Sequence, residues 1–215
     1  MKAKLLISGL VVLLIIPVGG SMYRIIQMIS GGPVTPDNAR YFDLPWVLVI
    51  HAGGLSLFAL LAVFQLATSM RRPTPRLHRV FGRVAAGAGI SGALAGLWMV
   101  YAVPGQFAMQ WPMDVARIIA ASLILGFIAQ GVCTAMRGSM GAHRRAMLRA
   151  MAVVFSAATQ PFYYIPIMLI FGEPESGLAE ALLFSSGWGI NLIIVEWIIR
   201  RPLRNRALQA GEIYG

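Results

Sequence analysis

Six apolar stretches follow one another along the chain, each long enough to cross a lipid bilayer. They lie at about 5–28, 45–70, 79–103, 114–136, 147–171 and 179–199. A membrane-spanning helix needs roughly 20 apolar residues, so six of them leave only short loops in a chain of 215 residues. Hydrophobic residues make up 58% of the chain, which is above the roughly 45–50% of soluble domains. The sequence therefore predicts an all-α, polytopic membrane protein, a single transmembrane domain over residues 1–215, and excludes a soluble globule.

Basic residues are distributed unevenly between the two sets of helix ends. Fifteen of the 18 Lys and Arg residues fall on the side that also carries both chain termini. The positive-inside rule then places the termini in the cytoplasm, and we expect a bacterial inner-membrane protein. Because topology explains the basic excess, nucleic acid is not an expected partner. Lys2 and Lys4 before the first stretch also fit a signal peptide, whose cleavage would leave five helices.

Small residues recur on one face of the third stretch. This spacing lets helix backbones approach closely where no hydrophobic effect drives association. The third helix is therefore expected near the centre of a four-helix core made of the second to fifth helices, with the first and sixth flanking it. The residues are Ala85, Ala88, Gly89, Gly92, Ala93 and Gly96.

His78 and His143 occupy matching positions, each at the cytoplasmic start of an odd-numbered helix and each followed by arginine. This match suggests two related helical hairpins. Helix N-termini attract anions, and basic side chains strengthen the attraction. Two interpretations stay open: the arginines set topology and contact lipid phosphates, or they form an anion site. The arginines concerned are Arg79, Arg83, Arg144, Arg145 and Arg149.

The two histidines also suggest a cofactor. Haem iron with two axial imidazoles needs both on facing helices at one depth, and His78 with His143 meets the depth requirement. The nearby arginines would offset the propionate charge. His51 lies roughly 28 Å from the cytoplasmic end of its helix, so a second haem is not expected. The leading interpretation is a membrane redox or redox-accessory protein with one non-covalent b-type haem and no other metal, because two histidines alone fall short of a zinc site.

Polar residues within the apolar stretches mark a second candidate site. They are His51, Gln65, Gln160, Tyr163 and Tyr164. His51 lies roughly 9 Å from the outer end of its helix and suits a proton or quinol contact. Gln160-Pro161 and Pro166 bend the fifth helix, which predicts a mid-membrane pocket for a substrate or a quinone head group. No hydrolase motif of the G-x-S-x-G or H-E-x-x-H type is present.

Other functions compete with the redox one. A transporter or a lipid- or anion-binding protein would use the basic cytoplasmic site, and a structural subunit of a membrane complex would need none of these polar residues. A transporter should show interrupted helices in both halves, whereas only the fifth stretch has a proline pair. This difference favours the redox interpretation. Membrane lipids are expected partners, with a quinone or a membrane redox protein as further ones, and the glycine-rich faces leave the oligomeric state open.

A pattern over roughly residues 45–160 carries a family resemblance. It joins His51, Gly53-Gly54, Gln65, Arg71-Arg72, His78-Arg79, Gly82-Arg83 and His143-Arg144-Arg145 with Met147 and Arg149. It resembles a large family of bacterial integral membrane proteins known only as a domain of unknown function, in which Ala146 is usually tryptophan. The helical layout is also similar to that of the ascorbate-reducible transmembrane b-type cytochromes. That resemblance implies at most one haem, on His78 and His143. A second haem would need a histidine partner for His51 in the other hairpin, and the corresponding position, near Ala116, offers none.

Overall fold

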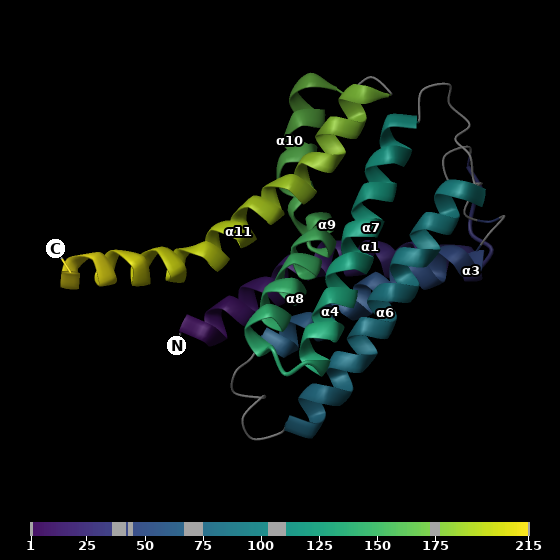
Figure 1. Ribbon diagram of the computed structural model, residues 1–215. Coiled ribbons are helices and arrows are strands. Elements are labelled where there is room, and N and C mark those ends of the chain that lie inside the picture. Colours follow the sequence, from purple (N-terminus) through teal and green to yellow (C-terminus); the bar gives the residue numbers. More distant parts are fainter. Residues whose placement is uncertain are drawn as a thin grey trace.

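The computed structural model describes residues 2–35, 42, 45–66, 75–102, 111–172 and 177–214, and within these ranges it describes the side chains of Leu5 and of residues 7–201. Within these ranges the chain is helical and contains no strand, which confirms the all-α class (Figure 1). The elements are α1 (Lys2–Ile29), α3 (Pro45–Leu48), η1 (Val49–Gly53), α4 (Gly54–Leu66), α6 (Pro75–Ala102), α7 (Trp111–Met136), α8 (Met140–Val154), α9 (Ser156–Thr159), α10 (Pro161–Phe171) and α11 (Leu178–Tyr214).

Five described segments are long and apolar enough to cross a membrane, which confirms a polytopic membrane protein. They are Ile7–Ile29, Pro45–Leu66, Pro75–Ala102, Trp111–Met136 and Leu178–Arg201. Four of the predicted stretches match these segments to within a few residues. The second predicted stretch extends to residue 70, and its last four residues lie outside the described ranges.

The predicted fifth helix over 147–171 is disrupted at Pro161, where a bend was expected, and it is also broken at Phe155. This part of the chain forms α8, α9 and α10, which follow one another from one end of the bundle to the other (Figure 1). Of these, α8 packs against α7, whereas α9 contacts α1 and α11. Pro161 explains the second break, because proline lacks the N–H of the helical ladder and its ring clashes with the preceding turn. It stands at the first position of α10, where proline is tolerated. The first break falls at Phe155 and has no such local cause.

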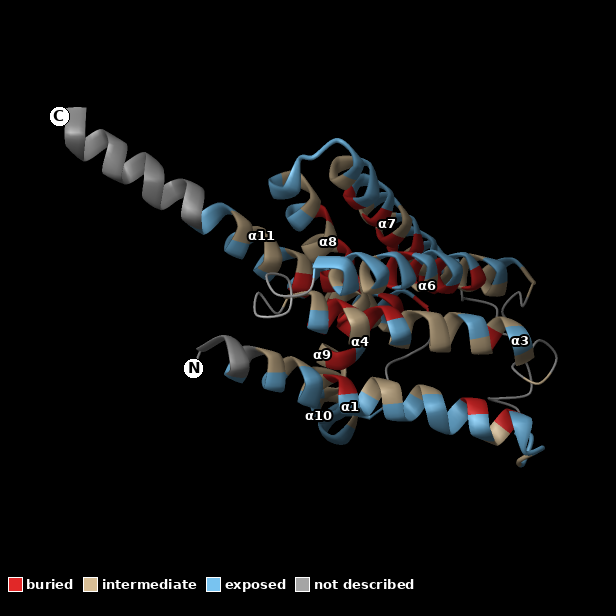
Figure 2. Ribbon diagram, turned by 90° about the horizontal axis from the view of Figure 1, so that it is seen from below, coloured by how far each residue is buried: buried red, intermediate tan, exposed pale blue. Residues whose placement is uncertain are grey.

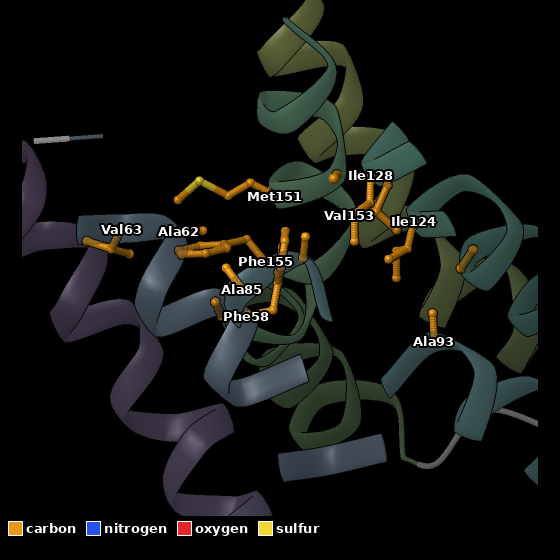
Figure 3. Close-up of a cluster of buried hydrophobic side chains, with 14 of the residues drawn as sticks. Phe58, Ala62, Val63, Ala85, Ala93, Ile124, Ile128, Met151, Val153 and Phe155 are labelled. Carbon is orange, nitrogen blue, oxygen red and sulfur yellow. The ribbon is translucent and has the colours of Figure 1, made fainter. Parts of the chain in front are cut away.

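The buried core lies between α4, α6, α7 and the α8–α9 region, as predicted for the second to fifth helices. Phe58, Val63, Ile128 and Val153 are the largest fully buried side chains. They interdigitate with alanines and with Phe155 (Figure 3). Buried residues face this centre and exposed apolar residues cover the outer helix faces, as in a protein surrounded by lipid (Figure 2). Most of α1 is exposed, although Leu14 joins the core.

The small-residue face of α6 sets the spacing of the core. A Cβ atom at Gly54 would lie 2.7 Å from the carbonyl oxygen of Ala88, and one at Gly89 would lie 2.8 Å from the Phe58 ring. Such distances are shorter than van der Waals contact, so α4 and α6 approach this closely only because glycines stand at the contact. The predicted central position of this helix is confirmed.

Candidate functional site

A cavity of about 510 Å³ lies between the two helical hairpins, in the half of the bundle where α7 begins. We call this side the Trp111 end and the opposite side, where α8 begins, the Met140 end. The walls come from α1, α6, α7 and α11, from η1, and from the breaks between α8 and α9 and between α9 and α10. Its polar lining consists of Ser21, Arg24, His51, Arg117, Ser156 and Gln160, and its larger apolar lining includes Leu55, Met99, Ile124, Phe184 and Trp188.

Three of these polar side chains come from similar depths on different helices. His51 and Arg117 are each six residues from the start of their segments, Pro45 and Trp111, which corresponds to about 9 Å along a helix. Arg24 is five residues from the end of α1, or about 7.5 Å. Ionisable groups at such positions inside spanning helices are costly and are functional candidates for that reason.

His51 is held in a notch on α6. Its Nδ1 atom lies 2.8 Å from the carbonyl oxygen of Gly92, and a Cβ atom at Gly96 would lie 2.8 Å from the same nitrogen. A carbonyl oxygen only accepts hydrogen bonds, so Nδ1 carries the hydrogen and donates. In the neutral ring, Nε2 is then the atom that accepts. His51 therefore brings a hydrogen-bond acceptor to the cavity wall.

The backbone around His51 is also irregular. Val49–Gly53 forms a π-helical turn between α3 and α4, and the N–H of Gly54 bonds back to the carbonyl oxygens of His51 and Ile50. Single π-turns inside α-helices are often found at functional sites. Here the turn contains one of the polar residues of the cavity.

The opposite wall comes from the interrupted fifth segment. Ser156 opens α9, and Gln160 lies between α9 and α10. The side-chain Nε2 of Gln160 donates to the carbonyl oxygen of Phe184 at 2.8 Å, and the hydroxyl of Tyr163 donates to that of Leu183 at 3.2 Å. These bonds fix the start of α10 against α11, because both partners are backbone atoms of α11.

Arg117 pairs with a carboxylate one turn away. Its Nη1 lies 3.1 Å from Oδ1 of Asp114, and the two side chains are 38% and 25% exposed. Asp114 is not part of the cavity wall, and no described lining residue is acidic. The wall therefore carries two guanidinium groups, and that of Arg117 is paired with Asp114.

The structure brings together two of the five polar residues that the sequence grouped. His51 and Gln160 face the same cavity. Gln65 lies at the Met140 end, where its Nε2 donates to the carbonyl oxygen of His78 at 3.1 Å. Tyr163 holds α11 and is not part of the described cavity lining, and Tyr164 is half-buried outside it.

The predicted haem residues lie at the Met140 end. His78 is in the first turn of α6 and His143 in that of α8, and α7 packs against both helices. Nδ1 of His143 lies 2.8 Å from the carbonyl oxygen of Gly131. Arg149 pairs with Glu196 of α11, whose other oxygen lies 3.5 Å from Arg200 of the same helix, so this carboxylate links α8 to α11. The remaining arginines of the set, Arg79, Arg83, Arg144 and Arg145, are exposed.

Sequence reasoning missed several residues of the cavity. Arg24 and Arg117 fall inside the predicted stretches 5–28 and 114–136 but near their outer ends, and therefore count among the end charges. The rule that flags His51, a costly polar group within a span, applies to them as well. Ser156 and Trp188 give no such signal, because serine and tryptophan are common in membrane helices.

Residues 48–199, which are well over half of the chain, match the sequence profile of a family described as "Predicted membrane protein (DUF2306)". The chain belongs to this family, which confirms the resemblance drawn from the histidine, glycine and arginine pattern. No curated protein and no solved structure matches the chain.

Proposed function

We propose that this protein is a carrier that binds a small organic molecule within the membrane. The family description gives no activity, so the proposal is argued from the geometry. The cavity between the two hairpins is the observation on which the proposal rests. Its volume of about 510 Å³ lies within the range of sites for single small molecules. A mostly apolar wall with a few convergent polar groups is typical of such sites.

Irregular helix geometry in both hairpins supports a carrier. Secondary transporters place their substrates near the interface of two repeats, beside helices that are discontinuous. In the second segment η1 is a π-helical turn within one helix that runs from Pro45 to Leu66, whereas the fifth segment is divided at Phe155 and at Gln160. Both irregular segments, with His51 on one and Ser156 and Gln160 on the other, contribute to the same cavity.

Ligand retention tests this proposal. Gly20 lines the cavity, and its neighbour Gly19 does not. A Cβ atom added at either glycine would meet no other atom within 4 Å, so both positions tolerate a large side chain without a clash at its base. We expect native mass spectrometry of the detergent-purified protein to show a bound small molecule in the wild type and in Gly19→Trp. In Gly20→Trp the indole fills part of the cavity, and the bound mass is lost.

Equal retention in Gly19→Trp and Gly20→Trp would contradict the proposal, as would a wild-type protein without any bound small molecule after gentle extraction in lipid nanodiscs. Thermal unfolding of the three proteins serves as the folding control. A common midpoint establishes that a lost ligand reflects a blocked cavity and not a damaged bundle.

A b-type haem between His78 and His143 is the second candidate, with a redox or redox-accessory function. It is favoured by the contact of His143 Nδ1 with the Gly131 carbonyl, because metal-ligating histidines usually donate their other ring N–H to a carbonyl or carboxylate. Nε2 would then be the iron ligand, and the haem would supply one-electron chemistry. Arg149 forms an ion pair with Glu196. The haem propionates would therefore be neutralised by the other arginines of the set, Arg79, Arg83, Arg144 and Arg145.

A quinone or quinol would be the natural membrane partner of such a redox protein, with its head group beside His51 and Gln160. The hydrogen-bond acceptor on His51 supports a quinol, whose hydroxyl groups donate. The cavity serves both candidates, which differ in whether the ligand is carried or oxidised.

A further inference from the structure

Ser156 places a buried hydroxyl group in the cavity wall. The residue is 3% exposed and opens α9, directly after the break at Phe155. A serine in a membrane helix commonly donates to the carbonyl oxygen four residues earlier. Here the carbonyl oxygen of Ala152 accepts from Nδ2 of Asn191 at 3.1 Å, and the Ser156 hydroxyl bonds to no described residue. Because a buried hydroxyl without a partner is costly, a ligand atom that bonds to it is favoured.

His51 brings a second unused polar atom to the same cavity, from the other hairpin. Its Nδ1 atom donates to the carbonyl oxygen of Gly92, so Nε2 is the accepting atom of the neutral ring. Among the described residues, none forms a hydrogen bond with Nε2. Nε2 only accepts, whereas the hydroxyl of Ser156 is able to donate. A head group that fits both atoms therefore carries a donor for His51 and an acceptor for Ser156, and a hydroxyl group supplies both.

The charged side chains of the wall have partners of their own. Arg117 pairs with Asp114 at 3.1 Å, and Arg24 is exposed and engaged in an interaction. The described wall thus holds no unpaired charge that would call for an ionic head group. The rest of the lining is mostly apolar and includes Leu55 and Trp188. This composition favours a neutral molecule with one polar end.

We propose that the ligand is a neutral amphiphile with a hydroxyl head, either phenolic or aliphatic. The hydroxyl donates to Nε2 of His51 and accepts from Ser156, and the apolar body lies against Leu55 and Trp188. This inference rests on the proposed function, since it names the class of molecule that the carrier binds. A buried site that bonds a hydroxyl group rejects the analogue without it, because the polar atom of the site is left unpaired. Quinols and lipid alcohols belong to this class, whereas quinones and ethers, which only accept, do not.

Trp188 gives a direct measurement of binding. Bromine quenches indole fluorescence at short range, so 11-bromoundecan-1-ol in the cavity quenches Trp188. We expect saturable quenching of the detergent-purified protein, and loss of the saturable part in Trp188→Phe, which separates Trp188 from the other four tryptophans. The methyl ether of the same alcohol lacks the donor, and we expect it to bind at least about tenfold more weakly.

Two variants assign the two hydrogen bonds separately. His51→Phe removes the acceptor, so the alcohol and the ether should bind about equally. Ser156→Ala removes one donor, and both probes should bind about fivefold more weakly, because the oxygen of an ether also accepts. The preference for the alcohol is a ratio measured within one protein, so a loss of stability does not imitate its disappearance.

Ser91→Ala is the matched control for Ser156→Ala. Ser91 is exposed on α6 outside the described cavity lining, and its hydroxyl donates to the carbonyl oxygen of Ala88 at 3.1 Å. Both affinities should stay unchanged in this variant. Ser156→Ala removes a single oxygen atom, so it tests the proposal even if the bundle does not tolerate His51→Phe.

The outcomes separate this inference from the carrier itself. Equal affinity of the wild type for alcohol and ether, an unchanged ratio in His51→Phe, or unchanged affinities in Ser156→Ala would each overturn the hydroxyl head. Tighter binding of 11-bromoundecanoate than of the alcohol, or no saturable quenching by either probe, would overturn it as well. Native mass spectrometry then still decides on the carrier. Stronger displacement of the bromo alcohol by decylhydroquinone would assign the head to a phenol, and stronger displacement by dioctanoylglycerol would assign it to a lipid alcohol.

Discussion

Nδ1 of His51 lies 2.8 Å from the carbonyl oxygen of Gly92, across the contact between η1 and α6. The bond uses a carbonyl oxygen of a neighbouring helix and fixes which ring nitrogen carries the hydrogen. It therefore couples the packing of two helices to the chemistry that His51 presents to the cavity. A change that moves α6 relative to η1 also changes the hydrogen-bonding state of the imidazole.

Replacement of Gly96 by alanine tests this coupling. The new Cβ would lie 2.8 Å from Nδ1 and 2.9 Å from Cε1 of His51, so the ring has to move and its bond to Gly92 weakens. We expect the free energy of unfolding to fall by about 1–3 kcal/mol, as for other overpacked cores. Thermal unfolding monitored by circular dichroism in detergent measures the change.

Gly87 of the same helix is the matched control. A Cβ at this position meets no atom within 4 Å, so Gly87→Ala gains helix propensity without a clash. We expect it to be neutral or slightly stabilising. A Gly96→Ala protein as stable as Gly87→Ala would show that His51 is not held in the notch.

The ion pair between Arg149 and Glu196 joins α8 to α11. Both side chains are about one quarter exposed, so the pair is worth more than a surface salt bridge and less than a fully buried one. Glu196→Gln should lower the free energy of unfolding by about 1 kcal/mol. Arg200→Gln should have a smaller effect, because Arg200 is 78% exposed at 3.5 Å from the same carboxylate.

A double-mutant cycle over Arg149→Gln and Glu196→Gln isolates the pairwise energy from other effects of each change. We expect a coupling of at least about 0.5 kcal/mol. Strictly additive effects of the two substitutions would contradict a direct contact between α8 and α11 through this pair.

An absorption spectrum tests the haem candidate. Protein purified from cells supplied with haem precursor should show a Soret band that shifts and sharpens on reduction by dithionite, and His143→Ala should lack it while remaining in the membrane. His51→Ala should keep it, because His51 lies at the other end of the bundle. A flat visible spectrum at full haem supply, or a band unchanged in both His78→Ala and His143→Ala, would remove this candidate.

Cysteine labelling tests the predicted orientation. Ser30 follows α1, and Ser139 lies between α7 and α8; both are exposed. In a Cys133→Ala background, Ser30→Cys should react with a membrane-impermeant maleimide in intact cells. Ser139→Cys should react only after permeabilisation, because the positive-inside rule places the Met140 end in the cytoplasm. The opposite labelling pattern would show that the basic end faces outward.

Features that depend on local sequence were predicted well. The small residues of α6 repeat with the period of a helix, so their shared face, and with it the central position of α6, could be inferred without any partner. The break before α10 follows from Pro161 alone. The family resemblance also came from a linear pattern, and its match over 48–199 confirms it.

Features that depend on tertiary contacts could not be predicted. The π-turn at His51 is accompanied by a bond to Gly92, which is 41 residues away in the sequence, and the break at Phe155 has no proline or glycine beside it. The helix bounds also matter for the site. Because α7 begins at Trp111 and not at residue 114, Arg117 lies six residues from the start of its helix, about 9 Å, instead of three residues.

The wall that α1 gives to the cavity lies outside the family segment. His51, Arg117 and Gln160 fall within residues 48–199, whereas Gly20, Ser21 and Arg24 precede them. Most of α1 faces away from the bundle, so few core contacts constrain its sequence. The selectivity of the proposed carrier therefore depends in part on a helix outside the family segment, because substitutions at these three positions change the cavity wall without changing residues 48–199.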